Sequence, residues 1–172
     1  MIREVITYPN KLLRTKSKDI LSFDNDLHIL LDDMYETMID KRGVGLAAIQ
    51  VGVPLNVLLI CLPDENDIQK HDNVLEAINP KIVSQEGSIV FTEGCLSVPD
   101  IHEDIKRSAI ISVEYYDRFG KKHTMEAKDF LAVVWQHEID HLLGHLFIEK
   151  LSIIKRKRFE KEWKKKYKSS YK

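Results

Sequence analysis

Hydrophobic and polar residues recur with two different periods in the first half of the chain, and each period predicts a kind of element. In residues 27–41 the apolar side chains lie three and four positions apart, which is typical of an amphipathic helix. Gly43 and Gly45 end that helix. Runs of branched apolar residues or alternating segments follow, and they predict strands. These strands are expected at 54–63, 75–84 and 88–92, with a polar loop at 64–74.

The second half of the chain shows a strand pattern followed by two helical patterns. Residues 109–127 alternate around a turn at 117–120, which predicts an antiparallel hairpin. A buried helix is expected from Asp129, a suitable N-cap, to Gly144, because apolar residues and two histidines share one face. A second helix, strongly basic, is expected over 151–168.

The order of these elements predicts an α+β fold. We expect antiparallel β-sheets around a central metal-binding helix, with an N-terminal helix and a C-terminal helix outside. Helices do not alternate with strands, which disfavours a parallel nucleotide-binding sheet. The length of 172 residues suits one catalytic domain over 1–150, with 151–172 as a helical extension of the same domain.

Composition adds a location and a redox state to this picture. The N-terminal segment has no continuous apolar stretch, and no segment approaches the length that crosses a bilayer, so we expect a cytoplasmic protein without membrane contact. Two cysteines, Cys61 and Cys95, are too few for a disulfide framework. Cys61 lies in an apolar run and is expected to be a small core side chain.

Charge is distributed unevenly between the body and the tail. Residues 151–172 hold 10 of the 26 lysines and arginines but only Glu160 and Glu162 as acids, which gives a charge of +8. The remaining 150 residues carry −9. This division favours a basic appendage with an anionic partner, RNA being the first candidate, although a solvated helix end remains open.

The sequence HEIDH (137–141) carries the clearest chemistry. His137 and His141 lie four residues apart, so on a helix both imidazoles project from one side and can bind one divalent ion. Glu138 lies on the flank, within reach of a water at that ion. A pair of hydrogen-bonded core histidines is the alternative. The pattern favours a metal-dependent hydrolase.

A catalytic site of this kind needs a third protein ligand and an open position for water. Phe147 stands where one known pattern has a third histidine, and phenylalanine cannot bind a metal. A second pattern would use Glu160 or Glu162, on a lysine-rich face. The third candidate is Cys95 in EGCLSVP (93–99), where we expect a strand to finish in an exposed bend closed by Pro99.

Three segments together resemble the peptide deformylase family: GVGLAAIQ (43–50), EGCLS (93–97) and HEIDH (137–141). Their order and spacing match over residues 1 to about 150. The resemblance implies hydrolytic removal of the formyl group from the N-terminal formyl-methionine of new proteins. It implies Cys95, His137 and His141 as ligands of ferrous iron, with zinc, nickel or cobalt able to replace it.

The resemblance also implies the roles of the remaining site residues. Glu138 would transfer protons, while the Gln50 amide and the Leu96 N–H would stabilise the oxyanion. An apolar slot would take the methionine side chain, and glycines would let the substrate backbone approach. The implied substrate-binding residues are Gly43, Val44, Gly45, Phe91, Gly94, Phe130, Val133 and Val134.

One departure concerns the mouth of the expected site. Many family members carry an arginine at the position of His102, so the preference beyond methionine does not carry over. Arg107 matches a basic family position, and Glu93 is a suitable partner that would rigidify the cysteine loop. The resemblance further implies a monomer whose basic C-terminal helix docks on ribosomal RNA and protein near the exit tunnel.

Two other functions remain open at the level of sequence. HEIDH alone would suit a small zinc endopeptidase that uses Glu160 or Glu162 as third ligand. An RNA-binding translation factor with a structural metal would need a fourth protein ligand, for which only His145 and Cys61 can be suggested.

Overall fold

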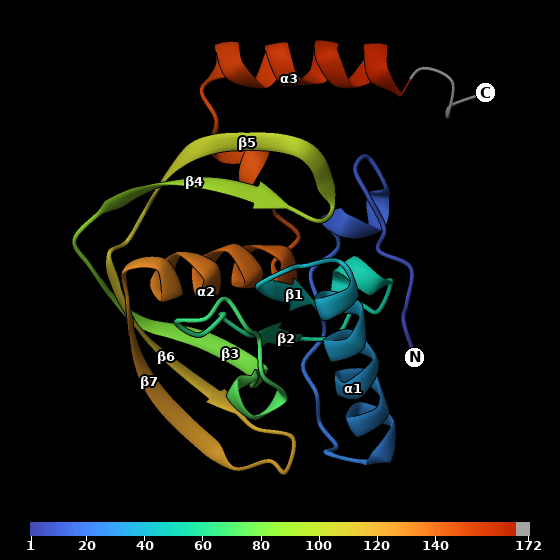
Figure 1. Ribbon diagram of the computed structural model, residues 1–172, viewed down its shortest axis with the longest axis vertical. Helices are drawn as coiled ribbons and strands as arrows, with labels where there is room; N and C mark the ends of the chain where they lie inside the picture. Colours follow the sequence, from blue (N-terminus) through green and yellow to red (C-terminus); the bar gives the residue numbers. More distant parts are fainter. Residues whose placement is uncertain (168–172) are drawn as a thin grey trace.

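The computed structural model describes residues 1–167, and in this part of the chain it has three α-helices and seven strands. Figure 1 shows helix α2 (Asp129–Leu142) in the centre, between a five-stranded sheet on one side and a two-stranded sheet on the other. Helix α1 (Asn25–Asp40) flanks the larger sheet, and α3 (Ile153–Lys166) lies beyond the smaller one. The predicted α+β architecture is confirmed.

The larger sheet has the order β1-β2-β3-β6-β7, and every neighbouring pair in it is antiparallel. The hairpin of β6 and β7 turns at Asp117–Gly120, where Gly120 has a φ of 77°, as the alternating pattern predicted. Strand β1 lies at the edge of this sheet. The strands are β1 (Gly45–Ala47), β2 (Val57–Ile60), β3 (Leu75–Glu86), β6 (Ile110–Tyr116) and β7 (Lys122–Lys128).

The smaller sheet contains β4 (Ile89–Cys95) and β5 (Val98–Arg107), which the sequence pattern did not predict as a pair. The expectation that Pro99 closes an exposed bend was wrong. The chain turns tightly between Cys95 and Val98, and Pro99 lies inside β5. A two-stranded sheet has only edge strands, so proline can occupy one without removing an interior hydrogen bond.

Helix α2 is buried along most of its length, which explains its apolar composition. Its N-cap is Lys128 rather than Asp129, which is already the first helical residue with a φ of 50°. Gly144, at a φ of 82°, follows the C-cap as predicted. A side chain there would come within 2.6 Å of the Arg14 carbonyl oxygen, so the helix end packs directly on the N-terminal segment.

The outer helices are held by apolar contacts on one face each. Asp24 caps α1 by accepting from the Leu27 N–H, and the buried side of α1 packs in a core with β2. Ser152 caps α3, whose Phe159 and Trp163 pack into a cluster with Val98 and Ile105 of β5. Residue 168, the last of the predicted basic helix, lies outside the described residues.

None of the helices in residues 1–167 combines the length and apolar content needed to cross a bilayer. The longest, α1, has 16 residues and carries several charges.

Candidate metal centre

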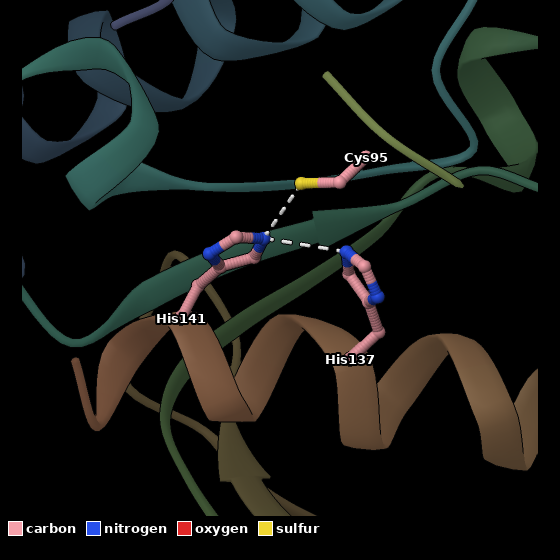
Figure 2. Close-up of side chains that lie close together, drawn as sticks. All are labelled: Cys95, His137 and His141. Carbon is pink, nitrogen blue, oxygen red and sulfur yellow. Dashed lines mark hydrogen bonds between the residues drawn. The ribbon is translucent and has the colours of Figure 1, made fainter. Parts of the chain in front are cut away.

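The two histidines of α2 project from the same side of the helix, one turn apart, toward the smaller sheet. Figure 2 shows their rings meeting at the nitrogen atoms, with His141 Nε2 lying 3.3 Å from His137 Nε2. Both side chains are buried. The four-residue spacing therefore places both imidazoles where one ion can bind them, as the sequence predicted.

Cys95 completes the group from the end of β4. Its Sγ lies 3.2 Å from His141 Nε2, and the potential ligand atoms of the three residues all lie within 4.8 Å of one another. The tight turn after Cys95 points the thiol at α2 instead of at solvent. Among residues 1–167, this is the cluster of histidine, cysteine or acidic side chains compact enough to hold a metal.

The chemistry of these three atoms fits a divalent cation. A tetrahedral ion with bonds of about 2.0–2.3 Å separates its ligand atoms by roughly 3.3–3.8 Å, close to the two observed distances. Burial lowers the pKa of His141 well below its ordinary value, so its ring is neutral and offers a lone pair. A cation among these atoms would also offset the repulsion between their lone pairs.

A buried ionic network fixes the orientation of His137. Its Nδ1 lies 2.8 Å from Glu93 Oε2, which leaves Nε2 free to face Cys95 and His141. Arg107 donates two hydrogen bonds to Glu93, at 2.6 and 2.8 Å, and a third to Asp140. Partnership of this kind sets the tautomer of a metal-binding histidine.

The charge of Glu93 is stabilised despite its burial. Burial alone would raise its pKa, but hydrogen bonds from Arg107 and His137 outweigh that effect and lower the pKa to about 2. Glu93 is therefore ionised throughout the neutral range. The predicted pairing of Glu93 with Arg107 is present in the structure, and it connects β4 to β5 beneath the cysteine.

Cys95, His137 and His141 are called the metal cluster below. Glu138 lies beside this cluster, against strand β1. Burial raises its pKa to about 7, and its Oε2 is buried without a hydrogen-bond partner among the described residues. A side chain at Gly45 would come within 2.8 Å of the Glu138 Cδ. Gly45 is thus required by the close approach of β1 to this carboxylate, a reason that the sequence pattern did not indicate.

Gln50 is held at the other side of the cluster by three contacts. Its Oε1 accepts from the Ala47 N–H at 2.9 Å, and its Nε2 lies 3.2 Å from Ser97 Oγ and 3.7 Å from Cys95 Sγ. The amide N–H group consequently points toward the cysteine. Gln50 and Ser97 are both buried, so these contacts fix the orientation of the amide.

A cavity of about 440 Å³ opens beside His137 and Glu138, and one wall of it is aromatic. Phe91 of β4 stacks on Phe130 of α2 with ring centroids 4.8 Å apart. Val133 and Val134 line the cavity from α2, and Val44 lines it from the segment before β1. All the substrate-binding residues predicted from the sequence line this one cavity, together with Gln50 and Leu96.

The residues required by the two other functions lie elsewhere. Glu160 and Glu162 form ion pairs with Arg156 and Arg158 along α3, and both acids are substantially exposed. His145 pairs with Glu149.

Cys61 is buried next to β2, and its thiol contacts the Lys70 carbonyl oxygen. Neither a third ligand from α3 nor a fourth from His145 or Cys61 joins the metal cluster in residues 1–167.

Several residues of the site were missed in the sequence. Asp140 receives a hydrogen bond from Arg107, and Ser97 orients Gln50. His102 does lie at the mouth, but its ring also covers Gly94, where a Cβ would come within 2.8 Å of His102 Nε2. Asp140 lies within HEIDH and Ser97 within EGCLS, so their places in these two segments were the available signals. The other contacts join distant segments.

Comparison with known proteins gives a consistent result over nearly the whole chain. A family model described as polypeptide deformylase matches residues 2–157. A curated relative from Campylobacter jejuni, named peptide deformylase, is 58% identical over 170 residues, which cover 98% of this chain and 97% of the relative.

Solved structures give the same match. A peptide deformylase from Legionella pneumophila superposes with a TM-score of 0.89 at 39% identity, covering 100% of this chain and 99% of that one. A peptide deformylase from Ehrlichia chaffeensis in complex with actinonin gives 0.88 at 38% identity, covering 96% and 97%.

Proposed function

Because this chain belongs to the polypeptide deformylase family, whose members hydrolytically remove the formyl group from N-terminal formyl-methionine, we propose that the cavity beside α2 carries out that reaction. The observation that carries the assignment of residues is the convergence of Cys95, His137 and His141 next to the buried carboxylate of Glu138, whose Oε2 has no hydrogen-bond partner among residues 1–167. Substrate enters the cavity with its formyl group toward this cluster.

The family is metal-dependent, and Cys95, His137 and His141 are the residues that would hold the ion. When bound, a divalent cation supplies Lewis acidity, which lowers the pKa of a water and polarises the formyl carbonyl. We propose ferrous iron as the ion, although zinc, nickel and cobalt suit the same donor set. Glu93 and Arg107 keep His137 in the orientation that binding needs.

Glu138 moves the proton in this reaction. Burial disfavours the charged form of this carboxyl and raises its pKa above the ordinary value, which suits a group that accepts a proton and then returns it. It takes a proton from the attacking water and returns it to the departing amine, which yields formate and a free N-terminus. The close packing of Gly45 holds the carboxylate in place.

Gln50 and Leu96 stabilise the oxygen that becomes negative when the formyl carbon is attacked. The Gln50 Nε2 group points toward Cys95, and it is already oriented by Ala47 and Ser97. The Leu96 N–H belongs to the tight turn that follows Cys95. Donors that are fixed before the reaction need no reorganisation, which is the source of their catalytic effect.

The methionine side chain occupies the apolar part of the cavity. Phe91, Phe130, Val133 and Val134 supply an apolar slot for this unbranched side chain, next to the proposed metal ligands. The peptide backbone extends along Gly43, Val44 and Gly45, because β1 is an edge strand and its outer side is not paired within the described sheet. Gly94 lines the cavity as well, and the His102 ring occupies the space where a side chain at this position would lie.

Substitution of the two cysteines separates this function from that of an endopeptidase. With formyl-Met-Ala-Ser as substrate, Cys95→Ser should lose both stoichiometric metal and formate release, whereas the matched variant Cys61→Ala should retain both. A protease that binds its ion through Glu160 or Glu162 would tolerate Cys95→Ser and would cleave internal peptide bonds. Retention of formate release by Cys95→Ser would reject the proposed ligand set.

We also propose a partner and a setting. The outer face of α3 carries Lys157, Lys161, Lys164 and Lys165, for which the structure gives no acidic partner among residues 1–167. Phosphate contacts from such a face would bind ribosomal RNA near the nascent-chain exit in a salt-dependent way. A cytoplasmic monomer, with 1–150 as the catalytic domain and 151–172 as its extension, suits this role.

Charge reversal tests the partner better than removal of the helix, because Phe159 and Trp163 are part of the core. A variant with Lys157, Lys161 and Lys164 changed to Glu should pellet less with ribosomes at low salt and keep its turnover of formyl-Met-Ala-Ser. The matched control changes Lys81, Lys106 and Lys121 to Glu, which alters net charge equally on the body. Equal pelleting of the two variants would reject docking through α3.

A further inference from the structure

The loop between β2 and β3 reaches the cavity wall through one side chain, Gln69. Its Nε2 donates a hydrogen bond to the Gly43 carbonyl oxygen at 2.8 Å and another to the Cys61 carbonyl oxygen at 2.6 Å. Gly43 lines the cavity two residues before the start of β1, while Cys61 directly follows β2. The Gln69 amide therefore joins two backbone segments that belong to neighbouring strands.

The loop itself is built to hold this amide in place. Asp64 accepts from the N–H groups of Asn66 and Ile68 at 2.9 and 3.1 Å, and it forms an ion pair with Lys70 at 2.6 Å. The Asp64 N–H donates in turn to the Ile68 carbonyl oxygen. Gln69 is half-buried, whereas the other residues of 65–73 are exposed. The hydrogen bonds within the loop therefore direct this one side chain inward.

Gly43 lies where a small displacement of its backbone would also move the residues that line the cavity. Its N–H donates to the Met38 carbonyl oxygen of α1 at 2.9 Å, so α1 and Gln69 hold its two backbone groups. A Cβ at Gly43 would come within 2.9 Å of the Leu96 side chain. Two residues later, the backbone of β1 abuts Glu138.

We propose that Gln69 is a positioning residue for substrate binding, which fixes the start of β1 so that its outer edge can pair with the peptide backbone beyond the formyl-methionine. This inference rests on the proposed function. Gln69 does not itself line the cavity, and it acts through the Gly43 carbonyl. Loss of the amide leaves two carbonyl groups without their donor and frees the start of the edge strand.

The test compares a long and a short substrate. Gln69→Leu keeps the size of the side chain and removes its donors. We expect the KM for formyl-Met-Ala-Ser to rise about 5- to 10-fold with kcat within about twofold, since a neutral hydrogen bond contributes roughly that factor. The kcat/KM for formyl-methionine amide, which has little backbone to pair, should change less than about twofold.

Two further variants keep the test decisive. Gln69→Asn retains the amide but is shorter, so it should resemble Gln69→Leu. Asn66→Ala is the matched control, because Asn66 is exposed and contributes to the loop through its backbone N–H.

Each remaining outcome has a separate meaning. An equal loss of kcat/KM on both substrates, or no loss on either, would overturn the positioning role. Absence of formate release by the unsubstituted protein would instead reject the proposed function itself.

Discussion

Strand β5 carries one buried set and one exposed set of ion pairs, and the two sets contribute differently to the site and to stability. Arg107, with 3% of its side chain exposed, pairs with Glu93 and Asp140 beneath the metal cluster. Near the surface, Glu103 and Asp100 of the same strand pair with Lys155 and Lys166 of α3, whose side chains are about half exposed. The inner set orients His137, which we propose as a metal ligand, whereas the side chains of the outer set are exposed to water.

Burial decides how much each set can contribute. A buried charge that loses its partner remains desolvated, which is strongly destabilising, whereas an exposed pair gains little because water screens it. We infer that α3 stays attached through Phe159 and Trp163 rather than through its charges. Its remaining lysines are then free to meet an external anion.

The largest effect is expected from Arg107→Ala, which leaves the buried carboxylate of Glu93 without its guanidinium partner, whereas Asp140 keeps its ion pair with Lys150. The free energy of unfolding should fall by about 3–5 kcal/mol. Urea denaturation of the metal-loaded protein measures it, with the exposed neighbour Lys106→Ala as control. A loss equal to that of the control would show that the inner network is no more important than a surface pair.

Trp163→Ala should come next, with a loss of about 3 kcal/mol, because the side chain is buried against β5 and the N-terminal segment. Its indole N–H has no hydrogen-bond partner among the described residues, so the loss reflects packing. Thermal unfolding of this variant beside Lys161→Ala, on the outer face, gives the contrast. Similar midpoints for the two would contradict apolar attachment of α3.

Glu93→Gln tests the inner network through metal affinity instead of stability. The amide keeps the size of the side chain but removes the charge that faces His137, so affinity for the ion should fall about 10- to 100-fold. Competition with a chelator measures this change. Glu103→Gln, which alters an outer acid of β5, should leave the affinity unchanged, and a fall in that control would erase the distinction.

The smallest effect is expected for Lys155→Ala combined with Lys166→Ala. Both ion pairs are exposed, so the midpoint of thermal unfolding should stay within the error of the measurement. A marked drop would mean that the outer pairs hold α3 after all. It would also weaken the inference that its charges serve a partner.

Local patterns allowed the sequence to predict much of this arrangement. The helix periods of α1 and α2 and the turn of the β6–β7 hairpin depend on near neighbours, and all three were predicted. Strand β5 was missed because Pro99 lies near its start and its apolar residues do not alternate regularly. Its pairing with β4 depends on a tight turn that packing stabilises.

The residues of the site also fall into two groups: those that a local sequence pattern predicts and those that depend on contacts between distant segments. His137 and His141 follow from spacing on one helix, but Cys95 lies 46 positions before His141 and was chosen among alternatives through its motif. Gln50 was indicated by the family resemblance alone. The contacts of Arg107 with Asp140 and of Gln69 with Gly43 join segments that are distant in the sequence, so no local sequence pattern predicts them.

The central claim is that Cys95, His137 and His141 bind a metal ion, and that Glu138 transfers the proton when formate is released. The most direct measurement purifies the protein and Glu138→Gln without oxygen, determines metal per chain, and follows formate from formyl-Met-Ala-Ser. We expect about one ion per chain in both, with turnover by Glu138→Gln lower by about 10²- to 10⁴-fold. Full metal occupancy without formate release by the unsubstituted protein would contradict the account.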